Sequence, residues 1–313
     1  MTAEATAPRI LVTCQTDHVP DVRTILEEGG EVTYYPYPTD ADLQAVIGHY
    51  HAVVTNVKQR ITPALLDRAV KLQVIATPST GTDHIDIANA QSRGIKVQSL
   101  KHDYDVLKDI TATAEQAFLL MLAVMRKLPF AFDHVRRGGW TEDRFRGREA
   151  NDRVVGIVGY GRLGEIFSRF AQGFGMRVIA CDPYREITDK WVRQVDMDTL
   201  LKEAEIITLH VHLTEGTHHM IGEKEFAGMH EGVYVVNTSR GGLIDETAFL
   251  QALRSGKVAG AGIDVLENEL DGNISQDPLV QYARENDNLI ISPHLGGKTY
   301  DSQLKAFRHT ARK

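Results

Sequence analysis

Short apolar runs alternate with longer amphipathic runs along the first hundred residues. The apolar runs have the length and composition of buried strands, and the longer runs carry apolar residues at helical spacing. The pattern predicts strands at residues 9–14, 31–35, 52–56, 72–77 and 95–97, with helices at residues 22–28 and 63–70. Because strands that alternate with helices pair in parallel, with helices on both faces of the sheet, we expect a small doubly wound domain here.

The same alternation resumes near residue 152. It predicts strands at residues 154–158, 176–182, 206–211, 233–238, 259–265 and 289–292, with helices at residues 163–174 and 246–254. Residues 111–128 are apolar around nearly the whole circumference of a helix and predict a buried helix, and residues 299–313 predict a final helix that returns to the first domain. The expected fold class is α/β with two doubly wound parallel-sheet domains, at residues 1–103 with 298–313 and at residues 104–297.

Three glycines lie where the predicted strand at residues 154–158 turns into a helix. Gly159 permits the tight turn, Gly161 lets a pyrophosphate approach the backbone, and Gly164 lets the helix pack closely on the strand. Backbone N–H groups and the positive end of the helix would hold the phosphates. We therefore assign the whole turn to cofactor binding: Gly159, Tyr160, Gly161, Arg162, Leu163 and Gly164.

Asp182 ends the second strand of this unit, 18 residues after Gly164. A carboxylate at that position accepts hydrogen bonds from both ribose hydroxyls of an adenosine and repels a 2′-phosphate, which favours NAD over NADP as the cofactor. Arg185, three residues later, leaves NADP open. Turn glycines that bind nothing are the alternative interpretation, and the strand, helix, second strand and acid at their expected places argue against it.

Composition and charge exclude several partners. With 35 Lys and Arg against 42 Asp and Glu in 313 residues, the formal net charge is −7, so there is no basic surface for nucleic acid. No run of 18 apolar residues is present to span a membrane. The first eight residues lack the basic segment and apolar core of a signal peptide, and the cysteines, Cys14 and Cys181, suit a reducing compartment, so we expect a cytoplasmic protein.

The histidine spacings do not predict a metal site. His210 and His212 alternate along one predicted strand without a nearby third ligand. His218 and His219 lie in a polar loop, where we expect them to be solvated. We therefore expect no bound metal.

Three ionisable residues follow the carboxyl ends of predicted strands, namely Arg240, Glu269 and His294. Strand ends at one edge of a parallel sheet converge on one crevice. Reduction of a 2-oxo acid needs a proton donor for the developing alkoxide, a cation for the carboxylate and an anion that keeps the donor charged. His294 fits the donor, Arg240 the carboxylate clamp and Glu269 the partner of the imidazole, with a nicotinamide as the hydride source. Glu267 competes with Glu269 for the partner role.

These motifs together resemble the D-isomer-specific 2-hydroxyacid dehydrogenases, particularly their phosphoglycerate dehydrogenase-like branch. They cover nearly the whole chain, at residues 79–86 (STGTDHID), 111–115 (TATAE), 138–140 (GGW), 159–164 (GYGRLG), 237–245 (NTSRGGLID), 262–265 (GIDV) and 292–297 (SPHLGG). The resemblance implies a Rossmann NAD-binding domain inserted in a flavodoxin-like substrate domain. It also implies activity on D-2-hydroxy acids and their 2-oxo acids, and a homodimer.

The resemblance further implies roles for single residues. The family's catalytic Arg, Glu and His fall on Arg240, Glu269 and His294, the Glu being the one that lies five residues after Asp264. Asp264 itself would lie at the nicotinamide carboxamide. The other implied site residues are Thr113, His210 and Thr238 in the cofactor cleft, Thr80 and Gly81 at the substrate carboxylate, and Asn56 and Lys58 where phosphoglycerate enzymes bind the phosphate.

Two other functions remain open alternatives. A formate dehydrogenase-like enzyme has a similar fold but a Gln as the partner of the His, and Glu269 argues against it. An NAD(H)-sensing binding protein of the corepressor type keeps similar site residues. The absence of long disordered or basic extensions argues against that second alternative, and a test for turnover of 2-oxo acids separates it from an enzyme.

Overall fold

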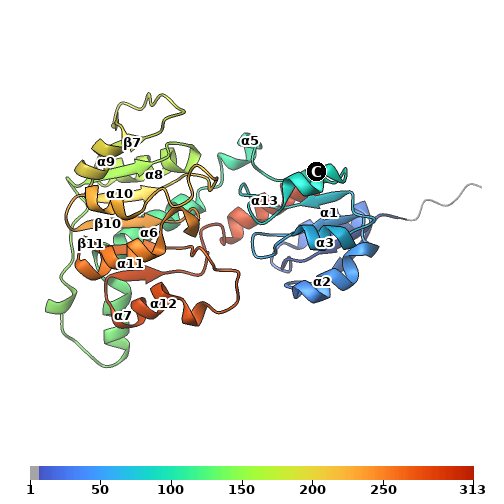
Figure 1. The fold of residues 1–313 in the computed structure, drawn as a ribbon, viewed down its shortest axis with the longest axis horizontal. Helices are drawn as coiled ribbons and strands as arrows, with labels where there is room; N and C mark the ends of the chain where they lie inside the picture. Colours follow the sequence, from blue (N-terminus) through green and yellow to red (C-terminus); the bar gives the residue numbers. More distant parts are fainter. Residues whose placement is uncertain (1–6) are drawn as a thin grey trace, which may run out of the picture. The chain divides into compact units, whose positions relative to one another are not determined.

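Two parallel sheets organise the chain in the computed structural model, which describes residues 7–313. The expectation about a signal peptide therefore concerns a segment that lies largely outside the described residues. The chain divides into two units, Met1–Ile110 with Thr299–Lys313, and Thr111–Lys298. Figure 1 shows both units along the chain. The predicted fold class, two doubly wound parallel α/β units, is confirmed.

The first unit has a five-stranded sheet in the order β2-β1-β3-β4-β5, with every pair parallel. This is the flavodoxin-like order. Its strands are β1 (Arg9–Val12), β2 (Glu31–Tyr34), β3 (Ala52–Val54), β4 (Val74–Ala76) and β5 (Lys96–Gln98). Its helices are α1 (Pro20–Gly29), α2 (Asp40–Val46), α3 (Pro63–Arg68), α4 (Ile87–Ser92), α5 (Tyr104–Leu107) and α13 (Tyr300–Arg312).

Alternating side chains give this sheet a core on each face. Leu11 packs into the core under α2, α3 and α4, while its neighbour Val12 packs into the core under α1 and α13, as expected for side chains that alternate across a strand. The last helix, α13, thus covers one face of the sheet of the first unit together with α1. The ion pair between Arg308 of α13 and Asp21 of α1 adds a polar contact at this packing.

The second unit has a seven-stranded sheet in the order β12-β11-β10-β9-β6-β7-β8, again parallel throughout. Its strands are β6 (Val154–Val158), β7 (Arg177–Cys181), β8 (Val192–Gln194), β9 (Ile206–Leu209), β10 (Val233–Asn237), β11 (Val258–Ile263) and β12 (Leu289–Ile291). Its helices are α6 (Ala112–Met125), α7 (Leu128–Arg136), α8 (Arg162–Gly173), α9 (Met197–Glu203), α10 (Glu223–Gly228), α11 (Glu246–Ser255) and α12 (Pro278–Glu285).

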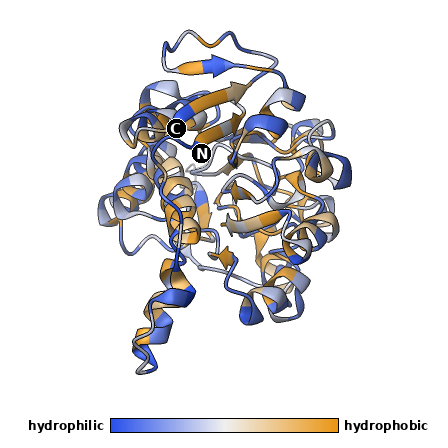
Figure 2. Cartoon of the chain, turned by 90° about the vertical axis from the view of Figure 1, so that its left-hand side faces the viewer, coloured by the Kyte–Doolittle hydropathy of each residue, from blue (hydrophilic) through white to orange (hydrophobic). Residues whose placement is uncertain are grey.

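One face of this sheet is covered by α9 to α12, and the other by α6 and α8. Helix α6 packs closely on β11 because the strand carries glycines there. A Cβ atom on Gly262 would lie 2.9 Å from Cβ of Leu120, and one on Gly260 would lie 2.9 Å from Cγ2 of Val124. Figure 2 shows apolar residues concentrated on the strands and mixed with polar ones along the helices.

The predicted helix at residues 111–128 is shorter in the structure. Helix α6 ends at Met125, Lys127 adopts a left-handed conformation with φ 51°, and α7 begins at Leu128 with Pro129 in its first turn. Proline lacks an N–H and clashes with the preceding turn, so a single helix cannot continue through this point. Among residues 7–313, no helix has both the length and the apolar character needed to cross a bilayer.

Candidate active site at the carboxyl edge of the seven-stranded sheet

The glycine turn between β6 and α8 has the geometry that its motif predicts. Gly159 has φ 88°, and a Cβ atom there would lie 2.7 Å from the carbonyl oxygen of His210. A Cβ atom on Gly164 would lie 2.3 Å from the carbonyl oxygen of Gly159, so the helix starts in contact with the turn. The Cβ position of Gly161 meets no atom of the described residues within 4 Å. The turn therefore leaves open space at the one glycine where a pyrophosphate would approach.

The first turn of α8 supplies the groups that an anion needs. Gly161 is its N-cap and makes no side-chain hydrogen bond to the first N–H groups of the helix, which are the donors that helix starts offer to phosphates. Arg162 and Leu163 are the first two residues of the helix and are half-buried. Burial lowers the pKa of the Arg162 guanidinium from its usual value, but the group stays positive at neutral pH.

Tyr160 does not turn its side chain toward this space. Its ring is fully buried, and its hydroxyl contacts Ser168 Oγ at 2.8 Å and Asp189 Oδ2 at 2.7 Å. Its backbone N–H donates to Asp182 Oδ2 at 2.9 Å. The residue that we assigned to cofactor binding thus positions the acid at the end of β7.

Two backbone N–H groups hold the side chain of Asp182 in place. The second is the N–H of Tyr184, 2.9 Å from Oδ1. Each oxygen keeps a further lone pair for a ribose hydroxyl. Arg185 binds Glu165 at 3.1 Å and the carbonyl oxygen of Tyr160 at 2.9 Å, so the nearby cation is already paired with a carboxylate.

Two buried polar atoms also lie at this edge of the sheet. His210 Nδ1 and Thr238 Oγ1 are buried and have no hydrogen-bond partner within residues 7–313, an arrangement that is costly unless a ligand supplies the partner. Burial lowers the pKa of His210 to about 3, so its imidazole is neutral. Strand β9 ends at Leu209, so the prediction that His210 and His212 alternate along the strand is wrong.

Arg240 lies three residues beyond β10 in a turn built by Asn237. Asn237 Oδ1 accepts the N–H of Ser239 at 3.0 Å, and its Nδ2 donates to the carbonyl oxygen of Arg240 at 2.8 Å. The Arg240 guanidinium donates to the carbonyl oxygen of Ser239 at 2.7 Å. The role of Asn237 was not predicted, although an asparagine at a strand end ahead of a turn is a recognisable signal.

Asp264 follows β11 and holds the loop that carries His294. Its carboxylate, buried with the rest of the residue, accepts from Ser292 Oγ at 2.5 Å, from the N–H of Leu295 at 2.8 Å and from the N–H of Gly296 at 2.7 Å. The N–H of His294 donates to the carbonyl oxygen of Asp264 at 2.9 Å. His294 has φ 58°, a left-handed conformation that needs such support in a residue other than glycine. Thr113 lies beside Gly296: a Cβ atom on Gly296 would lie 3.1 Å from Cγ2 of Thr113.

Glu269 contacts His294 and Glu267 does not take that place. His294 Nδ1 lies 2.5 Å from Glu269 Oε1, which leaves Nε2 as the outer nitrogen of the imidazole. Glu267 instead contacts His218 Nε2 at 2.9 Å and His219 Nε2 at 3.0 Å. Both histidines are partly exposed, as expected for a polar loop, and they also share one carboxylate.

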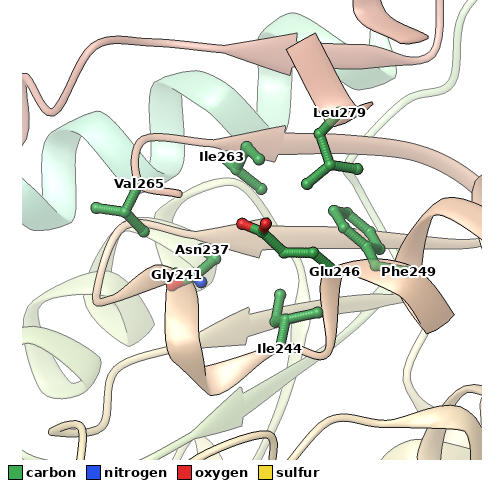
Figure 3. A pocket seen from close by; sticks show the side chains of 8 residues that line it. All are labelled: Asn237, Gly241, Ile244, Glu246, Phe249, Ile263, Val265 and Leu279. Carbon is green, nitrogen blue, oxygen red and sulfur yellow. The ribbon is translucent and has the colours of Figure 1, made fainter. Parts of the chain in front are cut away.

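A cavity of about 10 Å³ lies behind these loops, at the lower limit of the space that holds one water. Figure 3 shows the carboxylate of Glu246 pointing into it, among apolar side chains that include Ile263 and Phe249. Burial, helped by the negative charges of Asp277 and Glu267, raises the pKa of Glu246. Its Oε1 accepts the N–H of Glu267 at 2.8 Å. The cavity is far too small for a dinucleotide. Its residue Glu246 instead supports the loop after β11 through the hydrogen bond to Glu267.

The predicted substrate residues follow strands of the five-stranded sheet. Ser79 Oγ donates to the carbonyl oxygen of Gly81 at 2.7 Å, which shapes the turn that contains Thr80. Asn56 is buried, and its Oδ1 accepts the N–H of Lys58 at 3.0 Å, while the Lys58 side chain is exposed. Asn56 therefore builds a turn in the structure, and Lys58 presents the charge.

Two domain models of one protein family match the chain. Residues 10–128 match the catalytic domain of the D-isomer specific 2-hydroxyacid dehydrogenases, and residues 118–296 match the NAD binding domain of the same family. The chain belongs to this family. It is therefore an NAD-dependent oxidoreductase that interconverts 2-hydroxy acids and 2-oxo acids, and the glycine turn, Asp182 and the unpaired buried atoms of His210 and Thr238 fit that cofactor.

Individual relatives agree with the family. A hydroxypyruvate reductase of Thermotoga maritima is 36% identical over 264 residues, 84% of this chain and 83% of that protein. A D-3-phosphoglycerate dehydrogenase of Methanocaldococcus jannaschii is 36% identical over 91% of this chain, which spans 53% of that protein. The crystal structure of D-lactate dehydrogenase from Aquifex aeolicus, complexed with NAD and lactic acid, has a TM-score of 0.84 and 27% identity over 97% of this chain and 93% of that chain.

Proposed function

We propose that His294, Glu269 and Arg240 carry out the proton chemistry and carboxylate binding for D-2-hydroxy acids. The observation that supports this best is the 2.5 Å contact between His294 Nδ1 and Glu269 Oε1. It orients the imidazole by one nitrogen and leaves the other for the substrate. The three hydrogen bonds that Asp264 accepts hold the loop around His294 in place.

In the direction of reduction, Nε2 of His294 donates a proton to the carbonyl oxygen of the 2-oxo acid as negative charge develops there. Glu269 favours the imidazolium that serves as this donor. Arg240 binds the substrate carboxylate with two parallel N–H groups. The nicotinamide cofactor, when bound, supplies or removes the hydride. In the direction of oxidation, neutral His294 accepts the hydroxyl proton.

For the cofactor, we propose that Asp182 selects NAD over NADP. Its carboxylate lies at the end of β7 with both oxygens fixed by backbone donors, and Arg185 is paired with Glu165. The 2′-phosphate of NADP would be repelled by Asp182, and Arg185 would not offset this repulsion because it is paired with Glu165. Asp182→Ala should therefore reduce the ratio of NAD to NADP in kcat/KM, and an unchanged ratio would contradict this assignment.

We assign substrate binding to residues 1–103 with 298–313 and cofactor binding to residues 104–297. In the first of these domains, the turn of Thr80 and Gly81 would bind the substrate carboxylate, and Asn56 and Lys58 would lie near its variable end. The exposed ammonium group of Lys58 could bind a phosphate. A phosphorylated 2-oxo acid, as in a phosphoglycerate dehydrogenase, is therefore one candidate substrate. Small acids such as hydroxypyruvate are the other.

The decisive experiment measures NADH oxidation with hydroxypyruvate, glyoxylate, pyruvate and 3-phosphohydroxypyruvate. Turnover of at least one of them is expected. No turnover with any 2-oxo acid, despite NADH binding, would favour the NAD(H)-sensing alternative. Preference for the phosphorylated acid that Lys58→Ala removes would place the phosphate at Lys58.

We also propose a homodimer, supported by α7. None of the residues of this helix is buried, and its exposed apolar side chains include Leu128, Phe132 and Val135, with Trp140 just beyond it. Phe132→Glu should convert a dimer into a monomer in sedimentation velocity. Val70→Glu, at an even more exposed apolar position outside α7, is the control and should leave the dimer unchanged. Neither Cys14 nor Cys181 forms a disulfide within residues 7–313, which fits the cytoplasmic location that we propose.

A further inference from the structure

We propose that His218, His219 and Glu267 form a binding site for a divalent transition-metal ion of the zinc class. The three residues lie in the second unit, on loops that follow β9 and β11. They are separate from the contact between His294 and Glu269, and the proposal does not rest on the proposed catalytic roles. The family assignment does not suggest it, and it goes against our expectation of no metal.

The ligand atoms of these three side chains already converge. Nε2 of His218 lies 2.9 Å and Nε2 of His219 lies 3.0 Å from the same carboxylate oxygen of Glu267, and the second oxygen lies 3.1 Å from His219 Nε2. One ligand atom from each residue lies within 4.8 Å of the others. In a tetrahedral zinc site, ligand atoms are about 3.3 Å apart. Small side-chain rotations are therefore enough to admit an ion.

The backbone around the cluster is held in this arrangement. His219 has φ 51°, and its N–H donates to the carbonyl oxygen of Gly242 at 2.8 Å. The N–H of Glu267 donates to the carboxylate of Glu246, which is half-buried. A Cβ atom on Gly241 would lie 2.1 Å from the nitrogen of Glu267, so only glycine permits this approach. Three loops thus meet at the cluster, and the left-handed His219 brings its ring beside that of His218, with centroids 3.9 Å apart.

The donor set determines the class of ion. Two imidazole nitrogens and one carboxylate oxygen suit zinc, cobalt or nickel, whereas magnesium and calcium prefer oxygen ligands alone. Three protein ligands leave at least one coordination position for water. The side chains of His218 and His219 are 50% and 37% exposed, so an ion has access from solvent. A bound ion would link the loop after β9 to the loop that carries Glu267 and Glu269.

The test measures Co²⁺ binding to the untagged protein by calorimetry and by visible absorption. Wild type should bind one Co²⁺ per chain at this site. His218→Ala and Glu267→Gln should each weaken the binding at least tenfold, because each removes one of three ligands. His102→Ala removes an exposed histidine of the first unit and should leave the affinity unchanged.

A second measurement protects the test against variants that fold poorly. Zn²⁺ should raise the Tm of wild type and of His102→Ala, because an ion that binds only the folded state stabilises it, whereas it should not raise the Tm of Glu267→Gln or of the milder His218→Gln. Mg²⁺ should have no effect on any of them. Absence of Co²⁺ binding in wild type, or equal Co²⁺ affinity in wild type and both site variants, would overturn the proposal.

Discussion

Two carboxylates that lie two residues apart on one loop have different histidine partners. Glu269 contacts His294 through Nδ1, and Glu267 contacts His218 and His219 through Nε2 of each ring. The carboxylates themselves are nearly equally buried, with 24% and 27% of their side chains exposed. Burial of the acid therefore does not distinguish the pair that we propose for catalysis from the cluster that we propose for metal binding.

The difference lies in which ring nitrogen is used. In the first pair, the carboxylate takes the inner nitrogen and leaves Nε2, at the tip of the ring, for a substrate. In the second cluster, both ring tips point at the carboxylate, so neither histidine presents Nε2 to a reacting group. Asp264 sets the orientation of the His294 imidazole by holding its loop, and this orientation makes the first pair suitable for proton transfer.

The largest expected effect is that of His294→Ala. It removes the proton donor and acceptor, so kcat/KM should fall by about 10²- to 10⁴-fold in both directions, the usual contribution of general acid–base catalysis. Steady-state kinetics with NADH and a 2-oxo acid, and with NAD and the 2-hydroxy acid, measure it. An equal loss in His218→Ala would erase the distinction between the two clusters.

Arg240→Lys should have the next largest effect. A lysine ammonium cannot reproduce the two parallel hydrogen bonds of a guanidinium to a carboxylate. We expect a loss of about 2 to 4 kcal/mol of transition-state stabilisation, the scale for removal of one preorganised donor. If kcat/KM stayed within about threefold of wild type, Arg240 would not be the carboxylate clamp.

Glu269→Gln sharpens the comparison through the reaction rate. The amide keeps the shape of the side chain but removes the charge beside Nδ1 of His294. In reduction of the 2-oxo acid, kcat/KM should fall about 10- to 100-fold, the equivalent of one charge-assisted hydrogen bond of about 1.5 to 3 kcal/mol. Steady-state kinetics with NADH and a 2-oxo acid measure it.

Glu267→Gln is the matched control for that experiment. It changes the neighbouring carboxylate in the same way, and kcat/KM for reduction should stay close to that of wild type. A loss in Glu267→Gln together with no loss in Glu269→Gln would exchange the roles of the two acids.

The smallest expected effect concerns stability. Glu267→Gln weakens hydrogen bonds to two half-exposed histidines, so the free energy of unfolding in the presence of a chelator should fall by about 0.5 to 1.5 kcal/mol. Urea denaturation measures it. A loss well above this range would show that the cluster is required for the fold even without an ion.

Much of the site follows from local patterns. The β6 strand, the glycine turn and helix α8 are contiguous in the chain, so the sequence predicts their geometry directly. Arg240, Glu269 and His294 could be selected because parallel strands place their carboxyl ends at one edge of the sheet. The break between α6 and α7 could also have been predicted, because Pro129 stands directly after it. The predicted helix ran to residue 128 because the apolar pattern continues to that point.

Other features were decided only in three dimensions. Tyr160 turns its ring into the core and holds Asp182, which lies 22 residues later. Asp264, 30 residues before His294, directs its carboxylate to the histidine loop. Neither orientation is visible in the sequence, because a side chain at a strand end can point to a ligand or to a neighbouring loop with the same spacing.

Hydrophobic periodicity and glycine placement act over a few residues, so the fold class, the cofactor turn and the residue types at the sheet edge follow from the sequence. The family motif pointed to Glu269 as the partner of His294, but the contact itself, and the meeting of His218 and His219 on Glu267, are seen only in three dimensions. Those contacts join residues 25, 49 and 48 positions apart. Their geometry depends on how neighbouring strands bring their loops together, and no local pattern specifies that.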